Sequence, residues 1–345
     1  MILQRGNVKD RRNKQRSLSV CQQIVKAPPA HILLLALILC SAFLASCTTT
    51  SSQQSAKATP SPTSTSKNVT LAPKITPTIP PTPTRATPQH YTAHVLLQGG
   101  NRPDDLAFDG KGRLLFSNPH NGTVNRLNAD GSVTVLLSGI NAPEGLVVLS
   151  DGTLVIAEQG PNRILTLAPG ALSTRVLRQL PGVPSTAHCK DGVDGIAFDA
   201  TTNTLIIPDS PTGEVYRLSL DGKTLTLLAA GMVRPVGAAV DAKGNVYVTD
   251  ECGNALWRIT SDGQKTRIGG FGMLDDVSID NNGMIFVTDL DPAIHALIRF
   301  NPVTGTRTTL ASKGYIEPQG LVLDQQGNIY VADDFANIIV EYTPS

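Results

Sequence analysis

Carboxylates recur at one position of a pattern that is repeated in the second part of the sequence. Each copy begins with a three-residue motif such as Pro-x-Gly, and a short apolar strand follows it. The third residue of this motif, usually glycine, is called the glycine position here. The residue before the glycine position is often acidic. Acids make up 27 of residues 90–345, so chance would place fewer than one acid among six such positions, yet four are acidic. Carboxylates crowded into a narrow site repel each other unless a cation neutralises them, and hard oxygen ligands suit Ca²⁺ or Mg²⁺. The six positions are Asp104, Glu144, Asp194, Val236, Asp275 and Gln319.

The repeat that carries these acids defines the fold. Its glycine-type positions are 105, 145, 195, 237, 276 and 320, at intervals of 40, 50, 42, 39 and 44 residues, and two of them, Asp105 and Asp276, are themselves acidic. In the first copy, apolar stretches separated by Gly turns predict four strands at 106–109, 113–118, 123–128 and 132–138. A period near 42 with four short strands per unit indicates propeller blades.

The two ends of the repeat region predict how the ring closes. One strand at 93–97 precedes the first complete unit, and the last unit stops after a third strand at 338–342. The N-terminal strand is therefore expected to complete the last blade, which removes exposed edges. We predict an all-β, six-bladed β-propeller over residues 90–345, with the acidic positions in a ring at one mouth of its channel.

The repeat resembles known families. The pattern Pro-x-Gly, three apolar residues, Asp-x-x-Gly-Asn, then Tyr-Val-x-Asp is clearest at 235–250 and 318–333 and is similar to NHL repeats and the related gluconolactonase/regucalcin superfamily. Members of that superfamily with lactonase activity hold a divalent cation at the channel mouth through Glu, Asn and Asp. The resemblance therefore implies a Ca²⁺ or Mg²⁺ site formed by Glu144, Asp194 and Asp275, with Asp104 or Asp276 contributing. No Asn occupies a ring position here, which departs from the family pattern.

Histidines on the mouth-side loops are candidates for proton transfer, because imidazole titrates near neutral pH. His120, His188 and His295 lie on such loops, and His188 is the preferred candidate because it belongs to the longest interval between repeats. The predicted catalytic residues are accordingly His188 and Asp194.

Two further sets of residues are expected to be structural. Acids or Asn close the second strand of each unit and are expected to bind backbone amides of nearby turns. These residues are Asn118, Glu158, Asp209, Asp250, Asp289 and Asp333. Cys189 and Cys252 fall on same-face loops of adjacent blades, and in an oxidising compartment they are expected to form a disulfide.

The N-terminal region predicts export. Residues 1–46 combine seven Lys/Arg with an apolar run from Ile32 to about Ala45, too short for a spanning helix and typical of a signal peptide. Leu44-Ala45-Ser46-Cys47 resembles a bacterial lipobox, which implies lipidation of Cys47. Residues 48–89 contain 12 Thr, 6 Ser and 8 Pro and are expected to form a disordered tether. The propeller would then be anchored by lipid to the outer face of the cytoplasmic membrane.

Charge and motifs limit the functional classes. Residues 90–345 carry 18 basic and 27 acidic side chains, so nucleic-acid binding is not expected, and we expect a monomer. The leading hypothesis is a metal-dependent hydrolase of lactones or similar esters. The alternative is a non-enzymatic NHL-like propeller that binds a glycan, peptide or surface partner. A third reading, a quinone-dependent sugar dehydrogenase, would require cofactor contacts from Arg102, Lys190 and Arg234.

The lipobox generates the first prediction. Blocking lipoprotein signal peptidase with a globomycin-type inhibitor is expected to accumulate a precursor that retains residues 1–46, detectable as a mobility shift on a gel. Normal processing in the presence of the inhibitor would contradict lipidation at Cys47.

Overall fold

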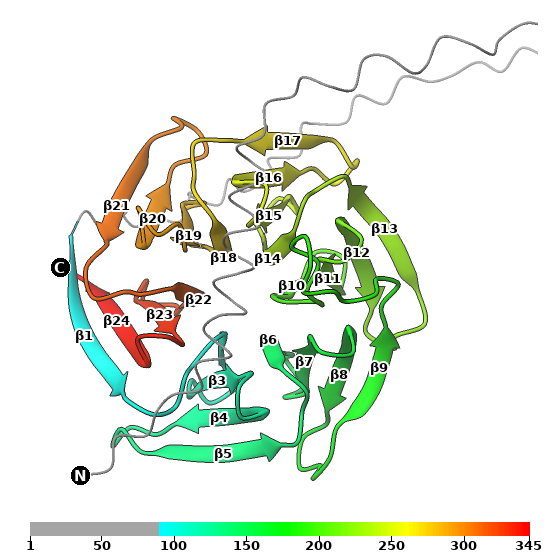
Figure 1. Ribbon diagram of the computed structural model, residues 1–345, viewed down its shortest axis with the longest axis horizontal. Coiled ribbons are helices and arrows are strands. Elements are labelled where there is room, and N and C mark those ends of the chain that lie inside the picture. Colours follow the sequence, from blue (N-terminus) through cyan, green and yellow to red (C-terminus); the bar gives the residue numbers. More distant parts are fainter. Residues whose placement is uncertain (1–89) are drawn as a thin grey trace, which may run out of the picture. The chain divides into compact units, whose positions relative to one another are not determined.

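Six antiparallel sheets of four strands each form a closed ring around a central channel (Figure 1). The computed structural model describes residues 90–345. The predicted signal peptide, Cys47 and the tether lie outside the described residues. Within residues 90–345 there are no helices, and none of the described chain could cross a membrane as a helix. The predicted all-β, six-bladed propeller is confirmed.

Within each blade the strands run in sequence from the channel to the rim. Blades 1 to 3 contain β2 (Leu106–Phe108), β3 (Leu114–Asn118), β4 (Thr123–Leu127), β5 (Val133–Ser138), β6 (Pro143–Val148), β7 (Leu154–Glu158), β8 (Arg163–Leu167), β9 (Arg175–Gln179), β10 (Ala197–Asp199), β11 (Thr204–Asp209), β12 (Glu214–Ser219) and β13 (Leu225–Ala230). Blades 4 to 6 contain β14 (Pro235–Val240), β15 (Val246–Asp250), β16 (Ala255–Ile259), β17 (Lys265–Ile268), β18 (Leu274–Ile279), β19 (Ile285–Asp289), β20 (Ala296–Phe300), β21 (Arg307–Ala311), β22 (Pro318–Leu323), β23 (Ile329–Asp333) and β24 (Ile338–Pro344). The four strands expected in the first repeat agree with blade 1 to within one residue at each end.

The ring is closed by the first strand of the described chain. β1 (Tyr91–Gln98) pairs antiparallel with β24 as the outer strand of blade 6, with His94 opposite Glu341. A bulge between Val95 and Leu97 shifts the register, so Leu97 turns into the core while Val95 stays exposed. The predicted closure by the N-terminal strand is confirmed, and it leaves blade 6 with the same four strands as the other blades.

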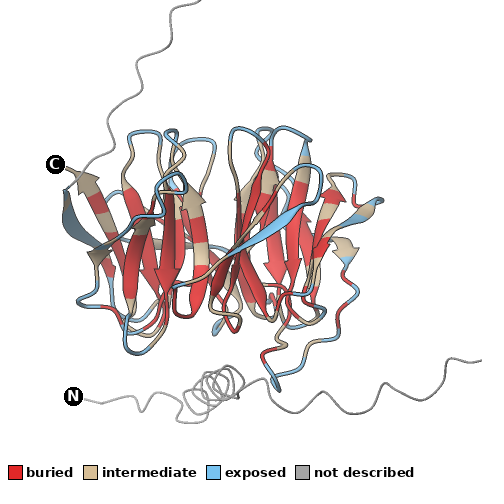
Figure 2. Cartoon of the chain, turned by 90° about the horizontal axis from the view of Figure 1, so that it is seen from above, coloured by how far each residue is buried: buried red, intermediate tan, exposed pale blue. Residues whose placement is uncertain are grey.

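The core lies between neighbouring blades. The second strand of a blade, such as β7, β15 or β19, is buried at every residue because both of its faces pack on adjacent sheets. One core cluster joins Val155 and Ile164 of blade 2 to Leu205 and Leu218 of blade 3. Figure 2 shows the buried residues gathered on the inner strands, with exposed residues on the outermost strands and on the loops of one face. Blade contacts therefore fix the inner strands whose ends surround the channel.

In blades 2 to 6 the acid at the end of the second strand holds the loop that enters the same blade. Asp250 accepts hydrogen bonds from the backbone amides of Arg234 at 2.8 Å and Gly253 at 3.2 Å. Asp333 binds the amides of Ile316 and Glu317 in the same way, at 2.7 and 3.0 Å. This is the structural role expected from the sequence, and it anchors the backbone just before the ring positions.

The closing strand generates a stability prediction. Leu97→Ala is expected to lower the free energy of unfolding by about 2 to 4 kcal/mol, because Leu97 is buried where blade 6 meets blade 1. Val95→Ala on the same strand, where the side chain is 59% exposed, is expected to change it by less than about 0.5 kcal/mol. Urea unfolding of both variants measures the difference. Equal effects would show that the bulge does not set which side chain packs in the core.

Candidate functional site

Glycine brings the inner strands close together at the level of the acidic ring. The amide of Gly145 donates to the carbonyl of Asp194 at 3.1 Å, and the amide of Gly320 donates to the carbonyl of Asp104 at the same distance. A Cβ added at Gly145 would lie 2.6 Å from the Asp194 carbonyl oxygen, closer than real Cβ contacts allow. The recurrent glycine therefore permits direct contact between the inner ends of adjacent blades, and that contact draws the preceding acidic residues together.

Three ring carboxylates form a cluster that suits a divalent cation. Asp104, Glu144 and Asp194 come from blades 1, 2 and 3, and one ligand oxygen of each lies within 4.8 Å of the others. Oxygens that coordinate one Ca²⁺ at about 2.3 to 2.6 Å lie at most about 5 Å apart, so this spacing is compatible with shared coordination. Asp104 and Glu144 are buried, whereas Asp194 is partly exposed.

A small acidic void lies beside this cluster. The void has a volume of about 10 Å³, comparable to the space needed for one water molecule. Its wall combines three glycines with carboxylates, namely Asp104, Asp105, Asp194, Asp275, Asp276, Gly195, Gly237 and Gly320. The sequence hypothesis placed Asp275 and Asp276 among the metal ligands. They line this void, but they do not belong to the three-carboxylate cluster.

The two acids that replace glycine bridge adjacent blades through their side chains. Asp105 accepts from the amides of Leu106 at 2.6 Å and Leu146 of blade 2 at 2.7 Å. Asp276 accepts from the amides of Val277 at 2.7 Å and Leu321 of blade 6 at 2.8 Å. Each carboxylate thus links its own inner strand to the next one.

Burial and nearby negative charges disfavour the ionised forms of these two bridging acids. Burial raises the pKa of Asp105 well above its ordinary value, and the charge of Asp276 raises it further. Burial also raises the pKa of Asp276 to about 7, with contributions from the charges of Asp194 and Asp104. The pair therefore retains a proton near neutral pH when no cation is bound.

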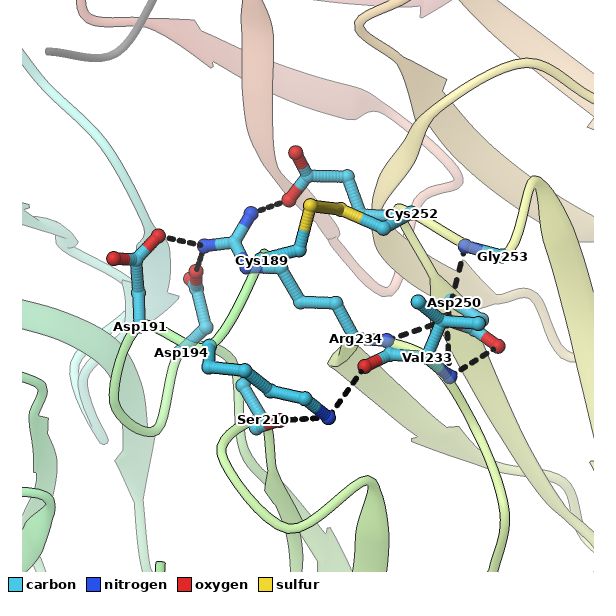
Figure 3. Close-up of a disulfide and its surroundings, with 11 residues drawn as sticks. Cys189, Asp191, Asp194, Ser210, Val233, Arg234, Asp250, Cys252 and Gly253 are labelled. Atoms are coloured by element: carbon cyan, nitrogen blue, oxygen red, sulfur yellow. Dashed lines mark hydrogen bonds and ion pairs between the residues drawn. A yellow bond between two sulfur atoms is a disulfide. The ribbon is translucent and has the colours of Figure 1, made fainter. Parts of the chain in front are cut away.

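Arg234 supplies a positive charge within the ring of acids (Figure 3). Its guanidinium lies 3.2 Å from Asp194 and 3.5 Å from Asp191, and it also pairs with Glu251. Burial alone would lower the pKa of Arg234, but the surrounding carboxylates, Asp191 and Asp194 foremost, outweigh it and raise the pKa. Repeat periodicity gave no signal for this role, because Arg234 lies on the loop before Pro235 and outside the ring position.

A disulfide joins the two loops that flank Arg234. Cys189 and Cys252 are bonded, with Cα atoms 6.6 Å apart, and both are fully buried beside Met273 and Leu290 (Figure 3). The bond ties the loop before Asp194 to the loop that carries Glu251. The partners of Arg234 on both sides are therefore fixed relative to each other.

The preferred histidine candidate is not part of the acidic cluster. His188 is exposed on its loop, and both His188 and Cys189 adopt the left-handed backbone region, with φ of 59° and 56°. Among the described residues, the cluster that the structure brings together consists of Asp104, Glu144 and Asp194 and contains no histidine.

A second polar group occupies mouth-side loops of blades 6 and 1. Asp334, fully buried, accepts from Gln319 at 2.5 Å and lies 3.1 Å from the Nε2 atom of His120. The guanidinium of Arg102 lies 3.3 Å from the same carboxylate and 5.1 Å from the ring centroid of Phe335. Sequence reasoning missed Asp334, because its contact with His120 spans 214 residues and depends on ring closure.

The cations considered for a quinone cofactor have other contacts. Arg102 pairs with Asp334, Lys190 donates to the carbonyl of Val233 at 3.0 Å, and Arg234 is surrounded by carboxylates. In the described structure these side chains join loops and acids rather than forming a shared anion site.

Solved structures with the same fold match the chain, whereas no family model and no curated protein matches it. A gluconolactonase from Xanthomonas campestris gives a TM-score of 0.62 at 17% identity, over 75% of this chain and 91% of that one. A catalytically inactive virginiamycin B lyase from Staphylococcus aureus, with quinupristin, gives 0.56 at 18% identity over 71% and 81%. A nidogen/laminin complex gives 0.55 at 19% identity over 64% and 85%. At these identities the likeness establishes the propeller fold.

The pair of bridging acids generates a prediction of pH dependence in the presence of a chelator. Because the pKa of Asp276 is raised to about 7, the folded state holds a proton that the unfolded chain has released above about pH 4. Relative to Asp276→Asn, which cannot ionise, the wild-type protein is expected to lose up to about 1.4 kcal/mol of unfolding free energy per pH unit between about 4 and 7.

Urea unfolding at a series of pH values measures this difference. Asp262→Asn, at an exposed turn, serves as the control and should follow the wild-type curve. If the difference in unfolding free energy between the wild-type protein and Asp276→Asn does not change with pH, the raised pKa of Asp276 is contradicted.

Proposed function

We propose that this protein is a divalent-metal-dependent hydrolase of lactones or similar esters, with the metal at the channel mouth. The observation that carries the proposal is the convergence of Asp104, Glu144 and Asp194, from three consecutive blades, to within 4.8 Å. A likeness in fold to a gluconolactonase supports the substrate class. Ca²⁺ is the preferred ion, with Mg²⁺ as the alternative, because all of the ligands are carboxylate oxygens.

The charge balance of the mouth supports a divalent cation. The nearby carboxylates are Asp104, Glu144, Asp191, Asp194, Glu251 and Asp275. Arg234 contributes a single positive charge against them, so a second, doubly charged cation would relieve the remaining repulsion. A cation would also favour the ionised forms of Asp105 and Asp276, which line the same void.

The side chains around the cluster would orient it for chemistry. Arg234 and Gln159 both bind the Oδ2 atom of Asp194, at 3.2 and 3.3 Å, and this fixes the direction of that carboxylate. A bound Ca²⁺ or Mg²⁺ supplies a Lewis acid that polarises an ester carbonyl and stabilises the oxyanion that develops. Within this proposal Asp194 is a metal ligand and keeps the catalytic role that the sequence hypothesis gave it. His188, exposed on its loop, is not assigned the proton transfer.

The proposal extends to location. A lipid on Cys47 and the Thr/Pro/Ser-rich segment 48–89 would hold a monomeric propeller at the outer face of the cytoplasmic membrane, with no nucleic-acid partner and with the lipid anchor as its only membrane contact. The propeller would then meet small lactones or esters outside the cytoplasm.

A second function, binding of a glycan, peptide or surface partner without catalysis, is retained because one solved structure of the same fold is a nidogen/laminin complex. A binding propeller has no need of a metal at its mouth. Metal-dependent hydrolysis therefore separates the two functions.

The metal site is tested by thermal unfolding with Ca²⁺ or Mg²⁺ against a chelator. A cation at about 100 times its Kd adds about 2.7 kcal/mol of stability, roughly 5 to 10 °C in Tm. The shift is expected in the wild-type protein and in the surface control Asp262→Asn, and it should disappear in Asp194→Asn and Glu144→Gln.

Hydrolysis is tested on the same four proteins with a panel of aldonolactones and aryl esters. Metal-dependent turnover that falls at least about 100-fold in Asp194→Asn is expected. A Tm shift without turnover would refute the hydrolase and leave a metal-stabilised binding propeller. Absence of both would favour the binding function without metal.

A further inference from the structure

His120 and Asp334 form an imidazole–carboxylate pair across the seam where the ring closes. His120 lies on the loop between β3 and β4 of blade 1, and Asp334 lies on the loop between β23 and β24 of blade 6. The Nε2 atom of His120 is 3.1 Å from Oδ2 of Asp334. The carboxylate is fully buried, whereas 20% of the imidazole side chain is exposed. The pair thus has a fixed inner member and an accessible outer member.

Two side-chain donors orient the carboxylate of Asp334. Gln319 donates to Oδ1, and Arg102 donates to Oδ2 at 3.3 Å. The positive charge of the Arg102 guanidinium favours the carboxylate form of Asp334, whereas the negative charge of neighbouring Asp333 opposes it. An ionised carboxylate only accepts hydrogen bonds, so in a neutral imidazole Nε2 of His120 would donate to it, and Nδ1 would be the nitrogen that can take up a proton.

One buried side chain holds the loop of His120 and the neighbouring loop of Arg102. Asn118, at the end of β3, donates to the carbonyl of Asn101 at 2.5 Å and accepts from the amide of Asn121 at 3.0 Å. One amide side chain therefore anchors both the loop of Arg102 and the loop of His120. Such support fixes a proton-transfer group more firmly than a loop residue without it.

The pair borders the acidic cluster. Gln319, which binds Asp334, occupies the ring position of blade 6, and the next ring residue around the channel is Asp104 of blade 1. The amide of Gly320, the residue after Gln319, donates to the carbonyl of Asp104 at 3.1 Å, so the backbones of blades 6 and 1 meet beside these two ring positions. Arg234, in contrast, approaches the cluster from blade 4. The imidazole and the guanidinium thus flank the carboxylates from different blades of the same mouth.

We propose that His120 is the proton-transfer residue of the hydrolase and that Asp334 is its positioning residue; this inference rests on the proposed function. In the first step a water oxygen bonds to the lactone carbonyl carbon while Nδ1 of His120 takes one proton from that water. In the second step the bond between the carbonyl carbon and the ring oxygen breaks, and His120 returns the proton to the departing alkoxide. The product is the hydroxy acid, and His120 ends in its starting state.

Steady-state kinetics on four variants of the full protein tests the role. His120→Gln is expected to lower kcat by about 100-fold or more, the usual contribution of a proton-transfer residue, while the metal-dependent Tm shift stays at the wild-type value. His120→Ala should regain activity when imidazole is added, because the site is partly open. Asp334→Asn should lower kcat and alter the acid limb of the kcat/KM pH profile. His94→Gln, exposed on the outer strand β1, is the matched control and should retain wild-type kinetics.

A second measurement does not depend on turnover. Nitrogen-15 NMR of the imidazoles is expected to show His120 with its proton on Nε2 in the wild-type protein and a mixture of tautomers in Asp334→Asn. A proton on Nδ1 in the wild-type protein would overturn the proposed role.

The kinetic outcomes separate the two proposals. Active, metal-dependent wild-type enzyme with an equally active His120→Gln variant would refute the assignment of His120 and leave the hydrolase standing. A wild-type protein that binds metal but hydrolyses no lactone or ester would refute the hydrolase, and the role of His120 with it.

Discussion

The main constraint on the mouth of this propeller is the electrostatic free energy of many negative charges in a narrow, largely buried space. Ionised carboxylates without compensation are strongly disfavoured there, so each one must find a donor, a cation or a proton. The chain supplies all three kinds of compensation. Backbone amides of adjacent blades donate to Asp105 and Asp276, and Arg234 pairs with Asp194. The raised pKa of Asp276 keeps a proton in the acidic void of the channel. A divalent cation would complete this balance, and the proposed chemistry would use the same charge that stabilises the fold.

The same constraint explains how strands and loops share the work of building the site. The backbones of inner strands come into close contact where glycine removes the Cβ, as at Gly145 and Gly320, and this contact brings the acidic ring positions together. Loops then bring the groups that strands cannot place. Arg234 is held through its own amide by Asp250, and the disulfide between Cys189 and Cys252 fixes the loops on either side of it. The strands therefore determine where the charge accumulates, and the loops determine how it is neutralised.

Much of this arrangement could be predicted from the sequence, because repetition encodes it. The intervals between glycine positions gave the blades, the unpaired first strand gave the closure, and the residue before each glycine gave the acidic ring. Contacts between side chains on different loops were not encoded in that way. The spacing of repeats says nothing about the direction of Arg234, and His188 stood in the longest loop but proved exposed. The pairing of His120 with Asp334 depends on residues that become neighbours only when the ring is complete.

That last contact links activity to the order of folding. β1 lies at the start of the described chain, and its partner β24 ends at Pro344, so the final sheet cannot form until the chain has emerged through β24. Contacts of such long sequence separation are slow to form, since the entropy of closing the loop must be lost before they gain any stability. His120 and Asp334 lie on the two sides of that seam. A chain that stalls before closure would present an acidic mouth, but its imidazole would lack the carboxylate that orients it, so the proposed proton transfer would begin only with the last folding event.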